Sequence, residues 1–200
     1  MKLLAATGNP HKLEELRRIL AHLGVEVISP KEAGVVSDAE ETGETFAENA
    51  RIKALDLYRK SGLPTVADDS GFCVDALNGA PGIYSARYGG EDTDYPTKFA
   101  LLYKELESVP GEKRAASFVS AICCVLDENT LLECEGVCPG VVADAPRGNS
   151  GFGYDPIFLV PEKGKTFAEL SDDEKDEISH RGRALRAFAV MLDNYMRNDT

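Results

Sequence analysis

Two long β-rich runs constrain the fold of this 200-residue chain more than any other feature. Residues 115–126 and 131–142 favour strands, and only the polar segment Asp127-Glu128-Asn129-Thr130 separates them. Two such runs joined by a short polar segment predict an antiparallel hairpin. We therefore expect a mixed sheet rather than a purely parallel, doubly wound one.

Strand and helix patterns alternate before the hairpin. Apolar spacing in residues 12–23 indicates a helix that Gly24 ends, and Thr45 with Glu48 fits a capping box ahead of a second amphipathic helix. The other expected elements are strands at 3–6 and 25–28, a polar loop at 29–42, and a strand that starts at 64–67 and ends at Asp68-Asp69-Ser70-Gly71. A helix at 95–107, a strand at 157–160 and a C-terminal helix with apolar residues at 185–195 follow. This order predicts an α/β fold with a mixed β-sheet flanked by helices.

The net charge limits the partners of this chain. Lys and Arg number 22 and Asp and Glu 34, so the formal charge is −12 at pH 7. Nucleic-acid polymers and anionic lipids need a basic surface, so we expect neither as a partner. No stretch approaches the ~18 apolar residues that span a membrane. The five cysteines are odd in number and form no C-x-x-C pair, which is typical of reduced thiols in a cytoplasmic protein.

The segment Thr7-Gly8-Asn9-Pro10-His11-Lys12 lies between a predicted strand and a predicted helix. Gly8 lets a ligand approach the backbone closely, and Pro10 suits the first helical position. The free N–H groups of a helix N-terminus attract anions, and Lys12 adds a positive charge. The alternative is an ordinary strand-to-helix turn with a solvated lysine.

Carboxylates gather where the strand at 64–67 is expected to end. Asp68 and Asp69 precede Ser70-Gly71, and Glu40-Glu41 lie upstream. Such oxygens bind Mg²⁺ or Mn²⁺, and a neighbouring carboxylate can deprotonate a water molecule. Because the chain has no Cys/His cluster, a hard divalent ion is the expected metal. The alternative is a loop whose Asp and Ser side chains cap backbone groups.

Lys53 is expected on the apolar face of its helix, by its spacing from Phe46, Ala50 and Leu57. An unpaired ammonium is costly there. Either the side chain extends past the core to solvent, or it points into a site that holds carboxylates or phosphate. The nearby Glu41 and the Asp68-Asp69 pair favour the second interpretation.

Two further segments carry groups that suit a ligand. In Phe152-Gly153-Tyr154-Asp155-Pro156 an aromatic ring beside glycine can stack on a base, and the aspartate can accept hydrogen bonds from ring N–H groups. Lys175 and Ser179-His180-Arg181 precede the C-terminal helix, and His and Arg donate to carbonyl or phosphate oxygens. The alternatives are a turn with core aromatics and an ordinary polar helix start.

Taken together, these segments resemble the inosine triphosphate pyrophosphatase family, whose members are also named noncanonical purine nucleoside triphosphate pyrophosphatases or dITP/XTP pyrophosphatases. The similarity runs through nearly the whole chain in order. The matching segments are Thr7-Gly8-Asn9 with Lys12, Glu40-Glu41-Thr42-Gly43, Phe46 with Glu48-Asn49-Ala50 and Lys53, residues 67–71, 79–88 and 151–158, and Lys175 with residues 179–181.

The resemblance implies a fold and an activity. The fold is a single domain, residues 1–200, with an elongated mixed sheet and two lobes that enclose the active-site cleft. The activity is Mg²⁺-dependent hydrolysis of ITP, dITP and XTP to the monophosphate and pyrophosphate by a homodimer. It removes these nucleotides from the nucleotide pool.

The resemblance also implies residue roles. Asp69 is the proton acceptor for water, with Lys53 in the same catalytic group. The metal lies between Asp69 and Glu41, with Glu40 as the alternative ligand and Mn²⁺ as a substitute metal. The implied substrate-binding residues are Thr7, Gly8, Asn9, Pro10, His11 and Lys12 for phosphate oxygens, Ser70 for the nucleotide, Phe152, Gly153, Tyr154 and Asp155 for the base, and Lys175, His180 and Arg181 to complete the pocket. As donors, His180 and Arg181 fit a 6-keto oxygen and disfavour the amino group of adenine.

Two other functions fit part of the pattern. A Mg²⁺-dependent phosphatase acting on monophosphates would gain from a D-x-D spacing after a strand, which Asp68-Asp69 does not provide. A nucleotide-binding sensor without turnover would bind tightly and form no product. The set of Asp69, Lys53 and Lys12 argues against the sensor.

Overall fold

The computed structural model describes residues 1–198 and divides the chain into two compact units. The first unit comprises Met1–Ser70, Ser120–Gly136 and the segment that begins at His180, and the second comprises Gly71–Val119 and Val137–Ser179. Within the described residues, no helix has the length and apolar character needed to cross a membrane. The expected arrangement of one domain with a cleft between two lobes stays a prediction.

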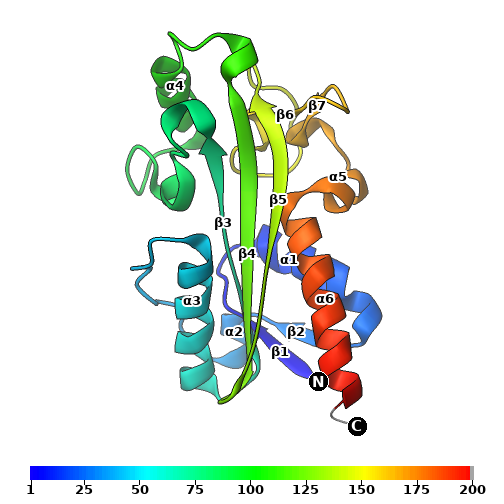
Figure 1. The fold of residues 1–200 in the computed structure, drawn as a ribbon. Coiled ribbons are helices and arrows are strands. Elements are labelled where there is room, and N and C mark those ends of the chain that lie inside the picture. Colours follow the sequence, from blue (N-terminus) through cyan, green and yellow to red (C-terminus); the bar gives the residue numbers. More distant parts are fainter. Residues whose placement is uncertain (199–200) are drawn as a thin grey trace. The chain divides into compact units, whose positions relative to one another are not determined.

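A seven-stranded sheet forms the framework, in the order β2-β1-β3-β4-β5-β6-β7 (Figure 1). Its strands are β1 (Lys2–Ala5), β2 (Glu26–Ile28), β3 (Thr65–Val74), β4 (Ala115–Asp127), β5 (Thr130–Val142), β6 (Phe158–Val160) and β7 (Lys165–Thr166). β1 runs parallel to β2 and β3, whereas β6 is antiparallel to β5 and β7. The two-residue turn Glu128-Asn129 joins β4 to its neighbour β5 as the expected hairpin. The predicted α/β fold with a mixed sheet is confirmed.

Short polar side chains begin most of the helices. The helices are α1 (Pro10–Leu20), α2 (Pro30–Ala33), α3 (Phe46–Ser61), α4 (Tyr95–Glu105), α5 (Asp172–Ile178) and α6 (His180–Asn198). Thr45 caps α3 by accepting from Glu48 N, as expected. The short α2 lies in the segment predicted as loop, because Ser29 and Glu32 form a capping box and Pro30 occupies the first helical position.

In the first unit, successive strand residues pack against helices on opposite faces of the sheet. Leu3, Val66 and Ile122 belong to a cluster with apolar residues of α1 and α6. Leu4 and Ala67 belong to a separate cluster with apolar residues of α3. Figure 1 shows α3 and α6 on opposite sides of β3 and β4. The two-residue period of a strand therefore decides which helix each strand side chain meets.

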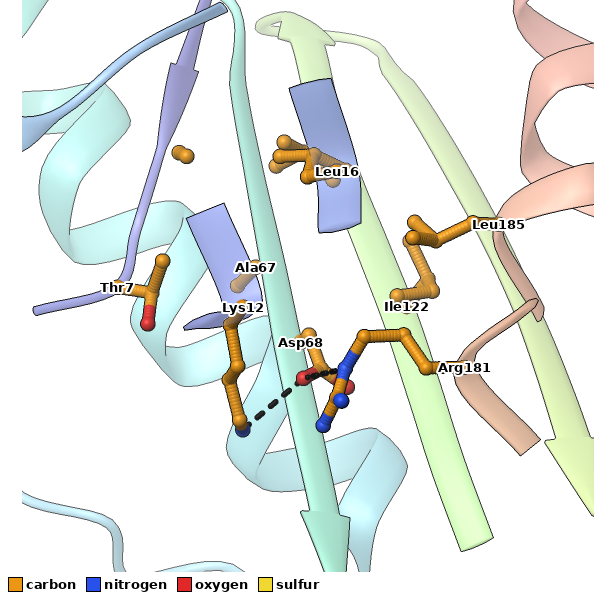
Figure 2. A pocket seen from close by; sticks show the side chains of 10 residues that line it. Thr7, Lys12, Leu16, Ala67, Asp68, Ile122, Arg181 and Leu185 are labelled. Atoms are coloured by element: carbon orange, nitrogen blue, oxygen red, sulfur yellow. Dashed lines mark hydrogen bonds and ion pairs between the residues drawn. The ribbon is translucent and has the colours of Figure 1, made fainter. Parts of the chain in front are cut away.

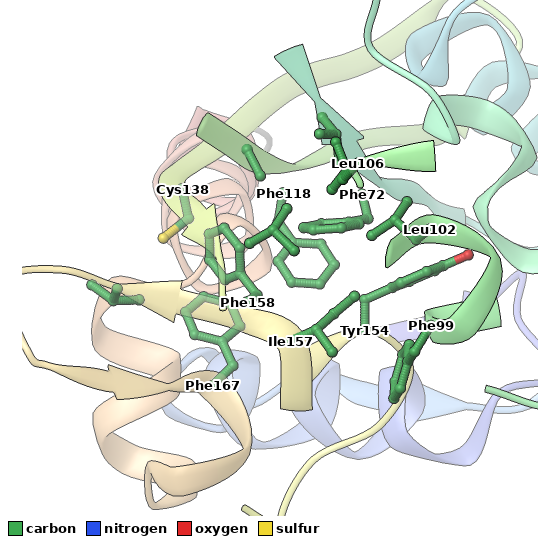
Figure 3. Close-up of a cluster of buried hydrophobic side chains, with 14 of the residues drawn as sticks. Phe72, Phe99, Leu102, Leu106, Phe118, Cys138, Tyr154, Ile157, Phe158 and Phe167 are labelled. Carbon is green, nitrogen blue, oxygen red and sulfur yellow. The ribbon is translucent and has the colours of Figure 1, made fainter. Parts of the chain in front are cut away.

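The second unit is built around aromatic rings (Figure 3). Phe72 stacks on Tyr154, with ring centroids 5.1 Å apart, and Phe118 stacks on Phe167 at 5.5 Å. Phe158 meets Phe118 edge to face at 4.8 Å. Offset and edge-to-face packing of this kind is favourable beyond the area that it buries. This core anchors the chain on both sides of the glycine-rich segment 148–153.

The structure corrects the predicted end of β3. The strand does not end at Asp68-Asp69-Ser70-Gly71 but continues through these residues to Val74. Carboxylates in a strand interior are costly unless they are paired. Here lysine, arginine and serine side chains of neighbouring elements bond both aspartates, so the strand runs on.

Candidate active site

Asp68 and Asp69 are consecutive in β3 and therefore point to opposite faces of the sheet. Asp68 has the parity of Val66, which faces α1 and α6, and Asp69 has the parity of Ala67, which faces α3. Each aspartate meets a different set of cations. The pair thus forms two adjacent charge clusters in the first unit rather than one loop.

Asp68 is the centre of the first cluster (Figure 2). Its Oδ2 lies 2.9 Å from Lys12 Nζ and 3.0 Å from Arg181 Nε, and its Oδ1 accepts from Ser120 Oγ at 2.6 Å. Burial alone would raise the pKa of Asp68, but Arg181, Lys12 and Ser120 together hold it well below its usual range. The carboxylate therefore stays ionised at neutral pH.

Arg181 connects this cluster to two further acceptors. The buried guanidinium donates to Glu15 at 2.7 Å and to Ser70 Oγ at 2.8 Å, besides its bond to Asp68. Asp68 and Glu15 raise its pKa against the opposing effect of burial. With Lys12, the cluster contains two cations and two anions. Arg181, expected from the resemblance to contact the base, is thus placed in a carboxylate network.

A small cavity lies beside the cluster, lined by Lys12, Asp68 and Arg181 and by apolar residues such as Leu16 and Ile122 (Figure 2). Its volume is about 20 Å³. A cavity of that size has room for about one water molecule.

Lys53 of α3 joins the second cluster. Its Nζ lies 2.7 Å from Asp69 Oδ1 and 3.2 Å from Glu41 Oε1, and it donates to the backbone oxygen of Asp68 at 3.1 Å. Burial opposes its charge, but Asp69 and Glu41 outweigh burial and raise the pKa of Lys53. Of the two interpretations of Lys53, the structure supports a lysine among carboxylates.

Asp69 retains an unused oxygen. Its Oδ2 is buried, and no hydrogen bond reaches it from any residue among 1–198. Burial raises the pKa of Asp69 despite the attraction of Lys53. A buried carboxylate oxygen that accepts no hydrogen bond lowers the stability of the fold. This oxygen therefore indicates a place that can bind a metal ion or accept the proton of a water molecule.

The carboxylates fit a magnesium ion. Mg²⁺ in proteins commonly binds one or two carboxylates together with water and substrate phosphates. Asp69 and Glu41 provide that pair, while Glu40 is exposed and makes no ion pair in the described part of the chain. No cluster of three or more His, Cys, Asp or Glu side chains suited to a metal occurs within residues 1–198.

The Thr7–Lys12 segment differs in part from the expectation. Asn9 Oδ1 accepts from His11 N at 2.9 Å and from Lys12 N at 3.4 Å, so the N-cap already uses two of the helix N–H groups expected to bind phosphate. A Cβ on the exposed Gly8 would meet nothing within 4 Å. Pro10 and His11 are exposed in the first turn of α1, and Thr7 Oγ1 accepts from Asn9 N. What the segment provides for binding an anion is the positive charge of Lys12 and the open space at Gly8.

In the second unit, the segment 151–155 and Lys175 form one local structure. Asp155 Oδ2 accepts from Phe152 N at 2.9 Å and from Lys175 Nζ at 2.7 Å. The Lys175 ammonium also lies over the Phe152 ring, 4.9 Å from its centroid. Gly153 has a φ of 67°, which side chains disfavour. The sequence-predicted Phe152, Asp155 and Lys175 are therefore brought together.

Tyr154 has a different place from its neighbours. Its ring is buried against Phe72, and its hydroxyl donates to the backbone oxygen of Ser85 at 2.8 Å. Its ring is therefore part of the core and anchors the loop, which agrees with the alternative of a turn with core aromatics.

The start of α6 packs directly on β5 in the first unit. A Cβ on Gly136 would lie 2.1 Å from His180 O and 2.6 Å from Ala184 N. Only glycine permits this approach, so Gly136 sets the position of the buried His180 and of Arg181.

Comparison with known proteins decides the family. A sequence model of the Ham1 family matches residues 3–191. The chain belongs to the Ham1 family. The dITP/XTP pyrophosphatase of Yersinia pseudotuberculosis is 51% identical over 198 residues, with 96% of each chain covered. The dITP/XTP pyrophosphatase of Treponema denticola is 49% identical over 194 residues, covering 96% of this chain and 98% of the relative. The solved structure of a HAM1 protein from Coxiella burnetii has a TM-score of 0.90 at 42% identity, covering 97% and 99%.

These matches confirm the resemblance drawn from the sequence motifs, because relatives that align over 96% and 98% of their length bear the name dITP/XTP pyrophosphatase. The family model matches residues 3–191, which is nearly the whole chain.

Sequence reasoning missed residues of the first cluster, which surrounds Asp68. Glu15 stands three residues after Lys12, a spacing that places both on one side of α1 and is the only signal for it. Ser120 gives no signal, because it meets Asp68 only through the pairing of distant strands. The expectations identified the carboxyl pair but assigned no role to Asp68 itself.

Proposed function

We propose that this Ham1-family protein is a dITP/XTP pyrophosphatase that hydrolyses noncanonical purine nucleoside triphosphates, including ITP, to the nucleoside monophosphate and pyrophosphate. The observation that carries the proposal is the 48–51% identity to proteins of that name over 96% or more of their length. The carboxylate and lysine cluster around Asp69 supplies the chemical support. Such an enzyme removes these nucleotides from the nucleotide pool.

Asp69 acts as the proton acceptor in this proposal. A water molecule attacks the triphosphate, its oxygen bonds to phosphorus, and the anhydride bond between the α and β phosphates breaks. The proton of the water goes to Asp69, whose buried Oδ2 has no donor among residues 1–198. The raised pKa of Asp69 makes the carboxylate a stronger base than an exposed aspartate.

Lys53 has a positioning and electrostatic role. Its ammonium holds Asp69 Oδ1 at 2.7 Å, which leaves Oδ2 as the free oxygen. A fixed carboxylate and a fixed cation require little reorganisation when charge moves to the leaving pyrophosphate. Lys12, 17% exposed, is the cation we assign to the phosphates.

Glu41 and Asp69 would hold the Mg²⁺ ion, for which Mn²⁺ can substitute. When bound, Mg²⁺ supplies charge neutralisation at the phosphate oxygens. We favour Glu41 over Glu40 because Glu41 shares the Lys53 ammonium with Asp69.

Base recognition is assigned to Phe152, Gly153 and Asp155 with Lys175, while Tyr154 anchors this segment in the core. Ser70 and the donors His180 and Arg181 are assigned to the same nucleotide. The Phe152 ring is partly exposed and is available for stacking on a purine. A pocket whose buried donors match a 6-keto oxygen rejects adenine, because those donors would then lack an acceptor.

A substrate panel tests the proposal. The protein is incubated with ITP, dITP, XTP, GTP and ATP in the presence of Mg²⁺, and pyrophosphate and orthophosphate are measured separately. We expect pyrophosphate from ITP, dITP and XTP at rates far above those with ATP. Orthophosphate as the first product would favour the phosphatase alternative, and tight binding without product would favour the sensor. Equal rates with ATP would also contradict the proposal.

A homodimer in the cytoplasm completes the proposal. The support for both is the family resemblance alone. Light scattering after gel filtration tests the dimer, and fractionation of cells tests the location.

A further inference from the structure

Asn49 is a fully buried polar residue of α3 that the proposed mechanism does not use. Its side-chain Oδ1 accepts a hydrogen bond from Gly43 N at 2.8 Å. Its Nδ2 is buried and has no hydrogen-bond partner in the described residues 1–198. A buried amide with unused donors opposes folding, so packing alone does not explain why this position carries Asn.

Gly43 fits against the first turn of α3 with no room for a side chain. A Cβ at this position would lie 2.7 Å from Asn49 Oδ1 and 2.7 Å from Glu48 Cβ. Glu48 adds a second tie, because its Oε2 accepts from Glu44 N at 2.7 Å. Two consecutive backbone amides of the loop at residues 40–44 are therefore held by two consecutive side chains of α3.

A further residue of α3 also holds this loop. Lys53 is four residues after Asn49, so both lie on one face of α3. Lys53 binds the Glu41 carboxylate at 3.2 Å, and Asn49 binds the backbone two residues beyond Glu41. The loop is thereby fixed at its side chain and at its main chain.

We infer that Asn49, through its bond to Gly43, is a positioning residue that holds Glu41 in place for a divalent cation shared with Asp69. The inference rests on the proposed function for the identity of the cation. Asn49 touches neither substrate nor metal. It acts by restricting the loop that carries Glu41.

The first measurement uses Mn²⁺ alone. Free Mn²⁺ is counted by its electron paramagnetic resonance signal while the full-length protein is titrated. Substitution of a residue that orients a metal ligand lowers metal affinity by about 10–100-fold. We expect Asn49→Leu, which has a similar volume, to weaken Mn²⁺ binding about tenfold at the low end of that range. The Mg²⁺ concentration for half-maximal hydrolysis of dITP should rise by a similar factor, with KM for dITP at saturating Mg²⁺ unchanged.

A double-mutant cycle separates positioning from general support of the fold. In a Glu41→Gln background the ligand is already lost, so Asn49→Leu should weaken Mn²⁺ binding no further. A merely structural Asn49 would lower affinity by the same factor in both backgrounds. That result, or no effect of Asn49→Leu in the wild-type background, overturns the inference.

Gly43→Ala tests the same contact from the loop side and decides the question if Asn49→Leu does not fold. The added methyl group displaces the loop, so Mn²⁺ affinity should fall as it does for Asn49→Leu. Glu44→Gln is the matched control, since it removes one exposed charge of the loop and keeps the Gly43 amide bond. It should change Mn²⁺ affinity by less than twofold, and a tenfold loss would overturn the inference.

The two proposals fail in different ways. A wild-type protein that binds Mn²⁺ and does not hydrolyse dITP contradicts the proposed function, while the binding cycle still tests Asn49. A wild-type protein that hydrolyses dITP and binds no Mn²⁺ overturns the inference alone.

Discussion

Arg181 Nε donates to Asp68 Oδ2 at 3.0 Å across 113 residues of sequence, and so ties the first turn of α6 to the middle of β3. Because Lys12 of α1 binds the same oxygen, one carboxylate joins three elements of the first unit. Asp68→Asn removes the negative charge and leaves the buried Arg181 and the half-buried Lys12 short of an anion. We expect a loss of about 3–5 kcal/mol in the free energy of unfolding, measured by urea titration.

Asp38 provides the matched control for that substitution. It also pairs with a lysine, Lys60, but its side chain is 63% exposed. An exposed ion pair contributes little to stability, so Asp38→Asn should have a much smaller effect than Asp68→Asn. Equal effects of the two substitutions would mean that Asp68 does not hold the buried cluster together.

Asp69→Asn should abolish turnover while the protein stays folded. The amide keeps an oxygen for Lys53 but cannot accept the proton of water. A positioned acid or base contributes about 10²–10⁴-fold to rate, so kcat for dITP should fall at least about 100-fold. Pyrophosphate release at saturating dITP and Mg²⁺ measures kcat, and circular dichroism checks the fold. A variant with more than a tenth of the wild-type rate would remove Asp69 from the role of base.

The sequence was sufficient for the sheet class and for most elements, because their apolar periods match the faces that are buried. Asp68-Asp69 shows where local patterns mislead. Two adjacent carboxylates are typical of a loop, and yet they lie inside β3, since Lys53 on one face and Arg181 on the other neutralise them. These partners come from distant parts of the chain, so no local sequence signal predicts the longer strand.

The candidate site likewise has one part that the sequence predicted and another that it did not. The position of Lys53 on an apolar helix face predicted its carboxylate partners, because helical spacing alone fixes that face. The partners of Arg181 were not predictable, since Glu15 and Ser70 meet it only after α1, β3 and α6 have packed. Tyr154 is buried in the core, unlike Phe152 of the same motif. The motif alone does not predict this difference between the two side chains.

Phe152→Ala should weaken nucleotide binding and leave catalysis nearly intact. The ring stacks under the Lys175 ammonium and is proposed to contact the base. Stacking of one base on an aromatic ring contributes about 1–3 kcal/mol, so KM for dITP should rise about 5- to 150-fold, with kcat within about threefold. Inorganic triphosphate, which has no base, should inhibit the wild type and the variant equally. An equal loss for triphosphate would show a general defect instead of lost base stacking.

The thiol of Cys123 should make the protein less stable at alkaline pH. Burial, with the nearby Glu133 carboxylate, raises the pKa of Cys123 to about 12 against the smaller opposing effect of Arg51. The thiol of an unfolded chain has a pKa of about 8.5. Below that value both states are protonated and the stabilising effect is fully present. Above it only the unfolded state ionises, so stability falls until the pH passes the folded pKa.

Cys123→Ala isolates this effect from other alkaline titrations. The slope of the unfolding free energy against pH should be less steep in the variant by up to about 1.4 kcal/mol per pH unit between pH 9.5 and 11. Urea titrations at half-unit steps of pH give both slopes. Between pH 6 and 8 the difference between wild type and variant should be constant, because the lost side-chain volume and the lost contact with Glu133 contribute equally at each pH. A difference that stays constant up to pH 11 would show that the native thiol ionises as readily as the unfolded one, and therefore that its burial does not oppose the thiolate.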